Sequence, residues 1–383
     1  MKQQSADRAR REIIRLCHAG LDSQTLRIEI IKRLRKAIPL DVSFFSTADP
    51  ATLLFTGAVV DEVLGRALPQ FLVNEFLQDD VNKFSRLARS ATLVGSLIQA
   101  TQREQERSPR YRDILAPLAL GDELRAALVT KGTCWGFLCL HRDRSSPNFT
   151  ATEAAFLSRI APHMALGLRK ALLLRSTVGS HVPDAPGLLL LTDDLTIVSV
   201  TPAAEQWLAE IAAADGTHKQ PLPYAIYAVV ARLKAIEHGS DAEVALVVPK
   251  VRLRAESGSW IVLHASRLSS ADANGLIAVI FEVARPIEIA PLIVQAYDLS
   301  KREGEIMQSV LRGLSTREIA ETFHIMPDTV QDYLKAIFEK VGVRSRRELV
   351  GQIFAQQYQP QVMSGRDVDA HGWFVQDATW PGI

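Results

Sequence analysis

The chain has 383 residues, of which 47% are hydrophobic and 23% charged, a composition that excludes a disordered or fibrous protein and predicts two to four packed domains. The 44 basic and 43 acidic residues leave a net charge of only +1, so attraction to nucleic acid would have to come from a local basic surface. Three scattered cysteines exclude a disulfide framework, and the absence of a signal-like start or an apolar run of 18 residues predicts a cytoplasmic protein without a membrane segment.

The first region mixes helices and short strands. Apolar spacing predicts two helices over residues 8–38 with a break at Gly20. The remaining predicted elements are, in order, strands at 41–46 and 53–60, a polar helical stretch, strands at 124–130 and 133–142 joined by a Lys131-Gly132 turn, and a long amphipathic helix at 150–175. The run Arg103 to Arg112 is interpreted as a solvated loop or helix face.

One motif in this region resembles a GAF sensor domain. It consists of the run Trp-Gly-Phe-Leu-Cys-Leu-His-Arg at 135–142, followed by Phe149-Thr150, Glu153, Phe156-Leu157 and Ala161. The resemblance implies a GAF-like α/β sensor domain over residues 1–175, with the last helix leaving the domain.

The side chains around this motif allow two interpretations. The aromatic residues Phe44, Phe45, Trp135 and Phe137 either complete the core or line a sensory pocket, and the core is favoured. Cys139 and His141 share a strand face and could touch a haem or a metal, but a pair in a pocket wall is the preferred interpretation. We therefore expect no metal site and no cofactor.

A second region follows a Ser-, Gly- and Pro-rich connection at 176–186. Strands are predicted at 187–191, 196–200, 243–248, 260–266 and 276–283, with helices after Thr201-Pro202. This order resembles a PAS-type sensor, which implies a PAS-like α/β domain over 176–290. Thr201 stands where many PAS domains place Asn, and a flavin-adduct cysteine motif is missing, so a purely structural PAS domain is expected.

The C-terminal region carries repeated helix signals. Three Ser-x-x-Glu capping boxes, at Ser300, Ser315 and Ser345, mark helix starts. Gly313 and Gly342 mark helix ends. Four helices are therefore predicted near 300–312, 315–322, 327–341 and 345–357.

The third of these helices has two different faces. Its apolar positions, with those of its neighbours, are expected to form a core of Ile306, Val310, Ile319, Ala320, Phe323, Val330, Leu334, Ile337, Phe338, Val341 and Leu349. The opposite face holds Asp328, Gln331, Asp332, Lys335 and Glu339. Gln331 can pair with adenine, Lys335 can donate to guanine or phosphate, and Asp332 can accept from cytosine.

The segment resembles the LuxR-type helix-turn-helix. The matching motifs are Leu-Ser-x-Arg-Glu from Leu299, Gly-Leu-Ser-Thr-x-Glu-Ile-Ala from Gly313, Thr329-Val330, and Lys-Val-Gly-Val-x-Ser-Arg-x-Glu-Leu from Lys340. The resemblance implies DNA contacts from Ser315, Thr316, Thr329, Gln331, Asp332, Lys335, Lys340, Arg344, Ser345 and Arg346, and dimer contacts from Val350, Ile353 and Phe354. Met326, where a capping Ser is usual, and Gln331, Asp332 and Tyr333 depart from the pattern, so the family's preferred bases cannot be transferred.

Together these regions predict a multidomain α+β fold: a GAF-like domain (1–175), a PAS-like domain (176–290), an all-α four-helix LuxR-type helix-turn-helix (291–358) and a tail (359–383). The expected function is a one-component transcription regulator that binds an inverted repeat in double-stranded DNA as a homodimer. A small-molecule effector and RNA polymerase are further candidate partners. The alternative is a constitutive dimeric DNA-binding or partner-interaction protein with empty sensor domains. Catalytic motifs such as HExxH and GxSxG are missing, so an enzyme is not expected.

Overall fold

The structure, a computed structural model, describes residues 2–174, 183, 185–215, 221–239, 248–269 and 275–351. These residues divide between two compact units. The first contains the described residues up to 174 and those within 185–254 and 261–283, and the second contains 183, 255–260 and 284–351. Among the described residues, no helix combines the length and apolar character needed to cross a membrane.

The first unit contains a five-stranded antiparallel sheet in the order β2-β1-β5-β4-β3. Its strands are β1 (Val42–Ala48), β2 (Phe55–Val60), β3 (Val94–Ser96), β4 (Leu120–Thr130) and β5 (Thr133–Asp143). The predicted strands and the predicted turn are confirmed, because Lys131 and Gly132 have positive φ angles of 50° and 76° that suit a two-residue hairpin. Strand β4 begins four residues before its predicted start.

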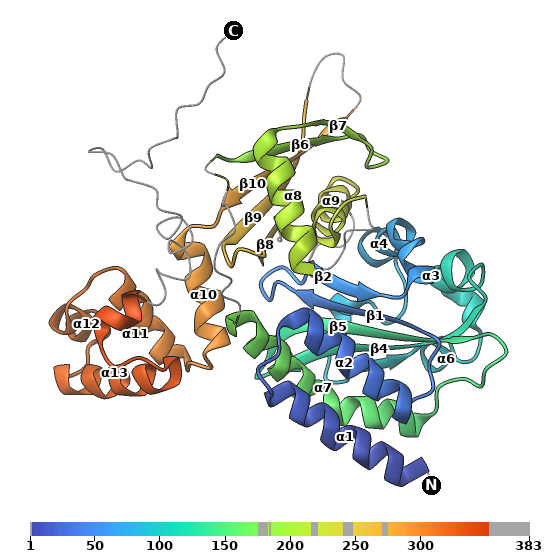
Figure 1. The fold of residues 1–383 in the computed structure, drawn as a ribbon, viewed down its shortest axis with the longest axis horizontal. Helices are drawn as coiled ribbons and strands as arrows, with labels where there is room; N and C mark the ends of the chain where they lie inside the picture. Colours follow the sequence, from blue (N-terminus) through green and yellow to red (C-terminus); the bar gives the residue numbers. More distant parts are fainter. Residues whose placement is uncertain are drawn as a thin grey trace. The chain divides into compact units, whose positions relative to one another are not determined.

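Three long helices, α1 (Lys2–His18), α2 (Ser23–Ala37) and α7 (Ala151–Leu174), lie together on one side of this sheet (Figure 1). Helix α7 approaches α1 closely because Gly167 has no side chain: a Cβ there would lie 3.1 Å from Cα of Cys17. Short helices occupy the predicted polar stretch, namely α3 (Glu62–Gly65), α4 (Leu68–Leu77), α5 (Phe84–Arg89), α6 (Leu97–Ala100), η1 (Gln105–Arg107) and η2 (Tyr111–Leu115).

An aromatic cluster fills the core beside the sheet. Phe44, Phe55, Phe71, Phe84 and Phe137 are buried and contact one another, with the rings of Phe84 and Phe137 stacked 4.7 Å apart. Phe45 and Trp135 are also buried. The structure therefore places these aromatic residues in the core, which is the interpretation that the sequence favoured.

The Arg-rich run 103–112 is not wholly solvated, which corrects the prediction. Arg110 is fully buried and donates to both carboxylate oxygens of Glu123. The sequence shows only a run of charged residues. It does not show that Arg110 meets the buried carboxylate of Glu123, which lies on a strand 13 residues further along the chain.

A second antiparallel sheet in the same unit has the order β7-β6-β10-β9-β8. Its elements are β6 (Gly187–Leu191), β7 (Ile197–Val200), α8 (Pro202–Asp215), α9 (Tyr224–Glu237), β8 (Lys250–Arg254), β9 (Trp260–Arg267) and β10 (Ile277–Val283). Four of the five predicted strands agree. Of the strand predicted at 243–248, residues 243–247 lie outside the described residues, and β8 itself was not predicted.

A buried ion pair joins the two sheets of the first unit. Asp49, just after β1, accepts from the backbone N–H of Arg252 on β8 at 3.0 Å, and Nη2 of Arg252 lies 2.6 Å from Oδ1 of Asp49. The Asp49 side chain is 1% exposed. Two charges removed from water in this way hold each other in place, because either one alone would be costly to bury.

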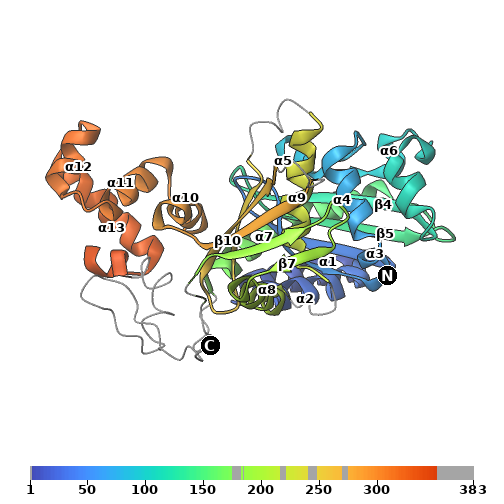
Figure 2. The ribbon, with the colours of Figure 1, turned by 90° about the horizontal axis from the view of Figure 1, so that it is seen from above.

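The second unit is helical. It contains α10 (Pro286–Ala296), α11 (Lys301–Leu311), α12 (Thr316–Phe323) and α13 (Pro327–Val341), and residues 346–351 are also helical. Figure 2 shows α11, α12 and α13 as one group, with α13 in contact with both of the others. Helix α10 was not predicted. It contains two prolines, Pro286 and Pro291, of which Pro286 lies in the first turn, where a missing N–H costs little.

Candidate nucleic-acid interface

Capping boxes fix the starts of the terminal helices. Ser300 begins α11 and Ser315 begins α12; each hydroxyl accepts from the N–H three residues later, and each glutamate accepts in return from the serine N–H. Both predicted boxes are confirmed. The third is only half formed: the Ser345 hydroxyl accepts from the N–H of Glu348 at 3.1 Å, but the Glu348 carboxylate accepts from the N–H of Arg344 instead.

The two predicted helix ends at glycine are confirmed, and one further helix end was not predicted. Gly313 and Gly342 have φ angles of 87° and 80° after α11 and α13. Helix α12 ends at His324, which takes the left-handed conformation with φ of 53° although it is not glycine. Helix α13 begins at Met326, which offers no side-chain cap, followed by Pro327, as the sequence indicates.

The predicted core of these helices is largely confirmed. The buried members are Ile306, Val310, Ile319, Ala320, Val330, Leu334, Ile337, Val341 and Leu349. Phe323 and Phe338 are only half-buried, which corrects the prediction for these two residues. Phe323 lies at the end of α12, where the guanidinium of Arg302 covers its ring at 4.4 Å.

The polar row of α13 stays clear of this core. Thr329, Gln331, Asp332 and Lys335 are all exposed. Nζ of Lys335 lies 3.7 Å from Oδ1 of Asp332, and both side chains are more than three-quarters exposed, so this pair is weak. The row is thus available to a partner that enters along the helix.

The start of α12 lies beside this row. Nε2 of Gln331 donates to the Thr316 hydroxyl at 3.5 Å, which places Thr316 and Ser315 next to the first turns of α13. Thr316 is half-buried and Ser315 is exposed. The structure therefore brings together five of the residues that the resemblance assigns to DNA, namely Ser315, Thr316, Gln331, Asp332 and Lys335.

Four basic residues at the end of α13 and just after it differ in their contacts, namely Lys340, Arg344, Arg346 and Arg347. Nζ of Lys340 donates to both oxygens of Glu303 on α11, at 2.9 and 2.6 Å, and the Arg346 guanidinium donates to the carbonyl of Leu314. Arg344 and Arg347 are exposed. Lys340 and Arg346 thus stabilise the domain, while Arg344 and Arg347 present their charge to solvent.

Two carboxylates of the caps have perturbed acidities. Burial raises the pKa of Glu303, but hydrogen bonds from Lys340 and Ser300 outweigh burial, and the pKa lies below its usual value. The pKa of Glu318 is also lowered, by hydrogen bonds from the backbone N–H and the hydroxyl of Ser315. Both carboxylates are therefore charged at neutral pH and hold their helix starts.

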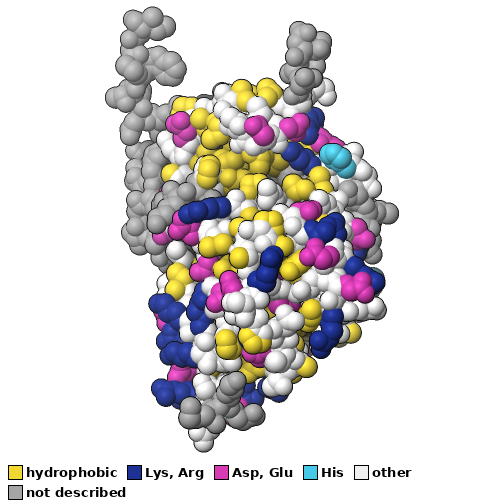
Figure 3. Space-filling view, turned by 90° about the vertical axis from the view of Figure 1, so that its right-hand side faces the viewer, with side chains coloured by type: hydrophobic (Ala, Val, Ile, Leu, Met, Phe, Trp, Pro, Cys, Tyr) yellow, Lys and Arg dark blue, Asp and Glu magenta, His cyan; other side chains and the backbone are white. Residues whose placement is uncertain are grey.

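The predicted dimer contacts are described only in part. Val350 is half-buried, whereas Ile353 and Phe354 lie outside the described residues, as does the predicted tail. On the face of the molecule in Figure 3, Lys and Arg are interspersed with Asp and Glu over most of the surface, and several Lys and Arg gather along its lower left edge.

Comparison with known proteins supports the domain assignments in the N-terminal and C-terminal parts of the chain. Residues 298–352 match the family described as bacterial regulatory proteins, luxR family, and residues 29–168 match the GAF domain. A stretch of 50 residues of this chain is 48% identical to the probable HTH-type transcriptional regulator GfsR of Streptomyces halstedii, and a stretch of 59 residues is 37% identical to the transcriptional regulatory protein DesR of Bacillus subtilis (strain 168).

These similarities are local. The matches cover 13% and 15% of this chain and span 21% and 30% of the two relatives. A crystal structure of the VqsR LBD domain from Pseudomonas aeruginosa aligns with 43% of this chain and 98% of that one, at 16% identity and a TM-score of 0.32. The PAS-like assignment stays a prediction.

Sequence motifs, helix geometry and family matches thus agree that this chain carries a GAF domain in its N-terminal part and a LuxR-family helix-turn-helix domain in its C-terminal part.

Proposed function

We propose that this protein is a one-component transcription regulator that binds duplex DNA through α13. The observation that carries the proposal is the exposed row Thr329, Gln331, Asp332 and Lys335 on a helix whose other face is buried. A helix of this kind fits the major groove, while the preceding helix crosses the DNA backbone. The match of residues 298–352 to the luxR family supports the same proposal.

Within the groove, three side chains read base edges. The amide of Gln331 offers a donor and an acceptor to adenine, Lys335 donates to guanine or to phosphate, and Asp332 accepts from the cytosine amine. Ser315 and Thr316 at the start of α12 contact the backbone together with Arg344 and Arg347, which supply the exposed positive charge. The chain thereby obtains a basic surface that its net charge of +1 does not suggest.

We further propose that the protein acts in the cytoplasm as a homodimer on an inverted repeat, without enzymatic activity of its own. A single domain with few free cations binds weakly, and two copies on a symmetric site double both the phosphate contacts and the base contacts. Val350, Ile353 and Phe354 are the proposed dimer contacts. RNA polymerase is the proposed protein partner of the DNA-bound regulator.

The GAF domain is the proposed sensor of a small-molecule or partner signal, with the second sheet as a relay. A signal changes DNA binding only if it favours one dimer geometry over the other. The rival proposal is a constitutive regulator with empty sensor domains. Native mass spectrometry of the purified protein separates the two: a retained small molecule supports sensing, and an apo dimer with tight operator binding supports the rival.

The test of DNA binding begins with selection of duplexes from a random pool by the full chain, followed by fluorescence anisotropy on the selected site. Gln331→Ala should raise the Kd for that site roughly 5- to 150-fold and relax the preference at one base pair, while binding to random DNA changes little. Gln70→Ala, the same change at an exposed position of α4, is the matched control and should leave the Kd unchanged. A Gln331→Ala variant that keeps wild-type affinity and preference would overturn the proposal.

A further inference from the structure

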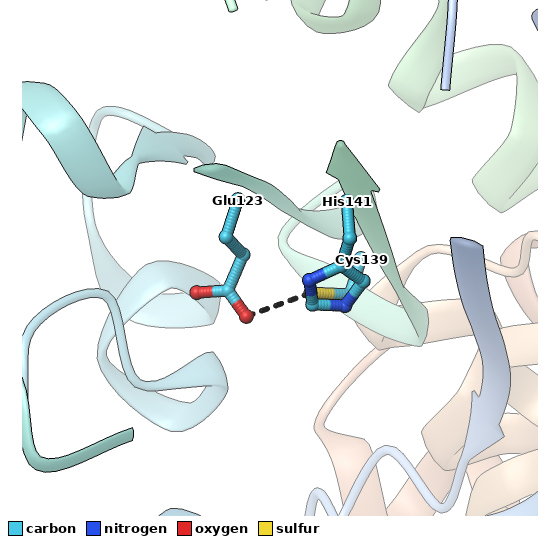
Figure 4. Close-up of side chains that lie close together, drawn as sticks. All are labelled: Glu123, Cys139 and His141. Carbon is cyan, nitrogen blue, oxygen red and sulfur yellow. Dashed lines mark hydrogen bonds between the residues drawn. The ribbon is translucent and has the colours of Figure 1, made fainter. Parts of the chain in front are cut away.

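Three side chains of the GAF domain converge in its interior. Glu123 lies on β4, and Cys139 and His141 lie on β5, where Glu123 pairs with His141 across the two strands. Cys139 and His141 are two residues apart, so they lie on the same face of the sheet as Glu123. Figure 4 shows the three side chains directed toward one another; one oxygen or nitrogen atom from each of Glu123 and His141 and the sulfur of Cys139 all lie within 4.8 Å.

The cluster is buried and one of its members is unsatisfied. Glu123 is 1% exposed, and Cys139 and His141 are fully buried. Among the described residues, neither ring nitrogen of His141 has a hydrogen-bond partner. A buried imidazole normally uses both nitrogens, so a ring without partners indicates a group that the protein chain alone does not supply.

The donor set identifies the class of that group. A neutral imidazole, a thiolate and a carboxylate are the ligands of zinc and of the divalent metals that bind similar sites, whereas calcium and magnesium prefer oxygen alone. We propose that Glu123, Cys139 and His141 form a binding site for a divalent transition metal of the zinc class. Three protein ligands leave a fourth position open for an exogenous ligand. This inference concerns metal binding alone and does not depend on DNA binding.

The cluster lies among buried charges. The carboxylates of Glu75, Asp80 and Glu123 face the guanidiniums of Arg110 and Arg125. A divalent metal that displaces the thiol proton of Cys139 adds only one net positive charge to these residues.

The present geometry needs a small contraction to hold the metal. The Cys139 thiol donates to Oε1 of Glu123 at 3.0 Å, so the sulfur and the carboxylate are already in contact. Metal–ligand bonds of about 2.0 to 2.3 Å in a tetrahedron place ligand atoms roughly 3.5 Å apart. To reach this spacing, Oε1 of Glu123 would turn from Nε of Arg110, from which it accepts at 3.2 Å, while Oε2 keeps its bonds to the same guanidinium. Binding replaces the S–H bond by a sulfur–metal bond and releases one proton to solvent.

The experiment uses the tag-free full chain, stripped of metal and kept reduced, and titrates it with Co²⁺ as the probe. We expect one equivalent to bind, with a thiolate-to-cobalt charge-transfer absorption, release of about one proton per ion at neutral pH, and displacement of Co²⁺ by Zn²⁺. A wild-type chain that binds no Co²⁺ at equimolar concentration, or binds it without the charge-transfer band, overturns the proposal.

Variants assign the site. Cys139→Ser should abolish the charge-transfer band, and His141→Gln should weaken Co²⁺ binding by more than roughly 100-fold, since even changes outside the first shell cost roughly 10- to 100-fold. Cys134→Ser is the matched control, because Cys134 is a buried thiol on the same strand whose sulfur contacts the Gly136 carbonyl. Circular dichroism confirms that each variant is folded. Retention of the band in folded Cys139→Ser, or its equal loss in Cys134→Ser, contradicts the assignment.

Discussion

The ammonium of Lys340 lies 2.6 Å from Oε2 of Glu303, the same carboxylate oxygen that accepts from the N–H of Ser300. One carboxylate therefore caps α11 and anchors the end of α13. Because α13 carries the proposed base contacts, this ion pair fixes the helix that DNA would meet. The side chain of Glu303 is 8% exposed and that of Lys340 is 38% exposed, so the pair is partly screened by solvent.

Replacing Lys340 should weaken the domain more than it weakens contact with DNA. Lys340→Met is expected to lower the free energy of unfolding of the second unit by about 1 kcal/mol, because the buried Glu303 carboxylate then lacks its cation, which is itself partly exposed. The matched control is Lys335→Met on the same helix, whose ion pair is exposed and whose loss should cost less than about 0.5 kcal/mol. Hydrogen exchange of the α11 and α13 amides measures the loss of stability in both variants. The slope of log Kd against log salt should fall more for Lys335→Met than for Lys340→Met.

The caps should also make this unit sensitive to acid. The folded-state pKa of Glu303 is lowered, so its contribution to stability is fully present above the unfolded value of about 4.3 and is lost as the pH falls through the folded value. Hydrogen exchange between pH 6 and pH 3 should show loss of protection in α11 beginning below about pH 4.3. Glu303→Gln should flatten this dependence, and an unchanged profile in that variant would contradict the assignment to Glu303.

Asp332 is expected to limit the affinity of α13 for DNA of any sequence. Asp332→Asn removes a negative charge that faces the groove and frees Lys335 from its 3.7 Å ion pair. Binding to random duplex should tighten several-fold and depend more steeply on salt. Anisotropy at two salt concentrations checks this, with Glu321→Gln on α12 as the control for a simple change in net charge. Equal tightening in both variants would show that the effect comes from the change in net charge and not from the location of Asp332 on α13.

Met326 leaves the start of α13 without a side-chain cap. Its backbone has φ of −73° and ψ of 146°, the extended conformation that a capping serine also uses. Met326→Ser should therefore stabilise α13 by about 0.5 to 1 kcal/mol. A higher thermal midpoint for the second unit is the expected result, and Met326→Ala, which cannot cap, serves as the control.

The pair Asp49 and Arg252 should be needed to keep the two sheets of the first unit together. Arg252→Met leaves the buried Asp49 carboxylate without its cation and should cost about 3 kcal/mol, whereas the double change Asp49→Asn with Arg252→Met should recover part of that loss. Urea denaturation monitored by tryptophan fluorescence measures the free energy of unfolding of the wild type, of each single variant and of the double variant. Additive losses in the double variant would show that the two groups are not coupled.

Local signals in the sequence were sufficient to predict the terminal helices. A capping box joins residues three apart, a glycine stop depends on one residue's own φ angle, and the apolar stripe of α13 repeats within a single helix. The turn at Lys131-Gly132 is equally local. The exposed position of Gln331 and Lys335 follows from the same stripe, because burying one face of a helix leaves the other free.

Contacts between residues distant in the chain were decided only by the tertiary structure. The sequence paired Cys139 with His141, but only the register of β4 against β5 adds Glu123 to them. From the sequence, Lys340 was predicted to contact DNA and Arg110 to be solvated. In the fold, Lys340 lies against the carboxylate of Glu303, and Arg110 lies against the carboxylate of Glu123. Periodicity reports which face of an element is buried; the partner that a buried charge meets there depends on how the chain packs, which no local pattern encodes.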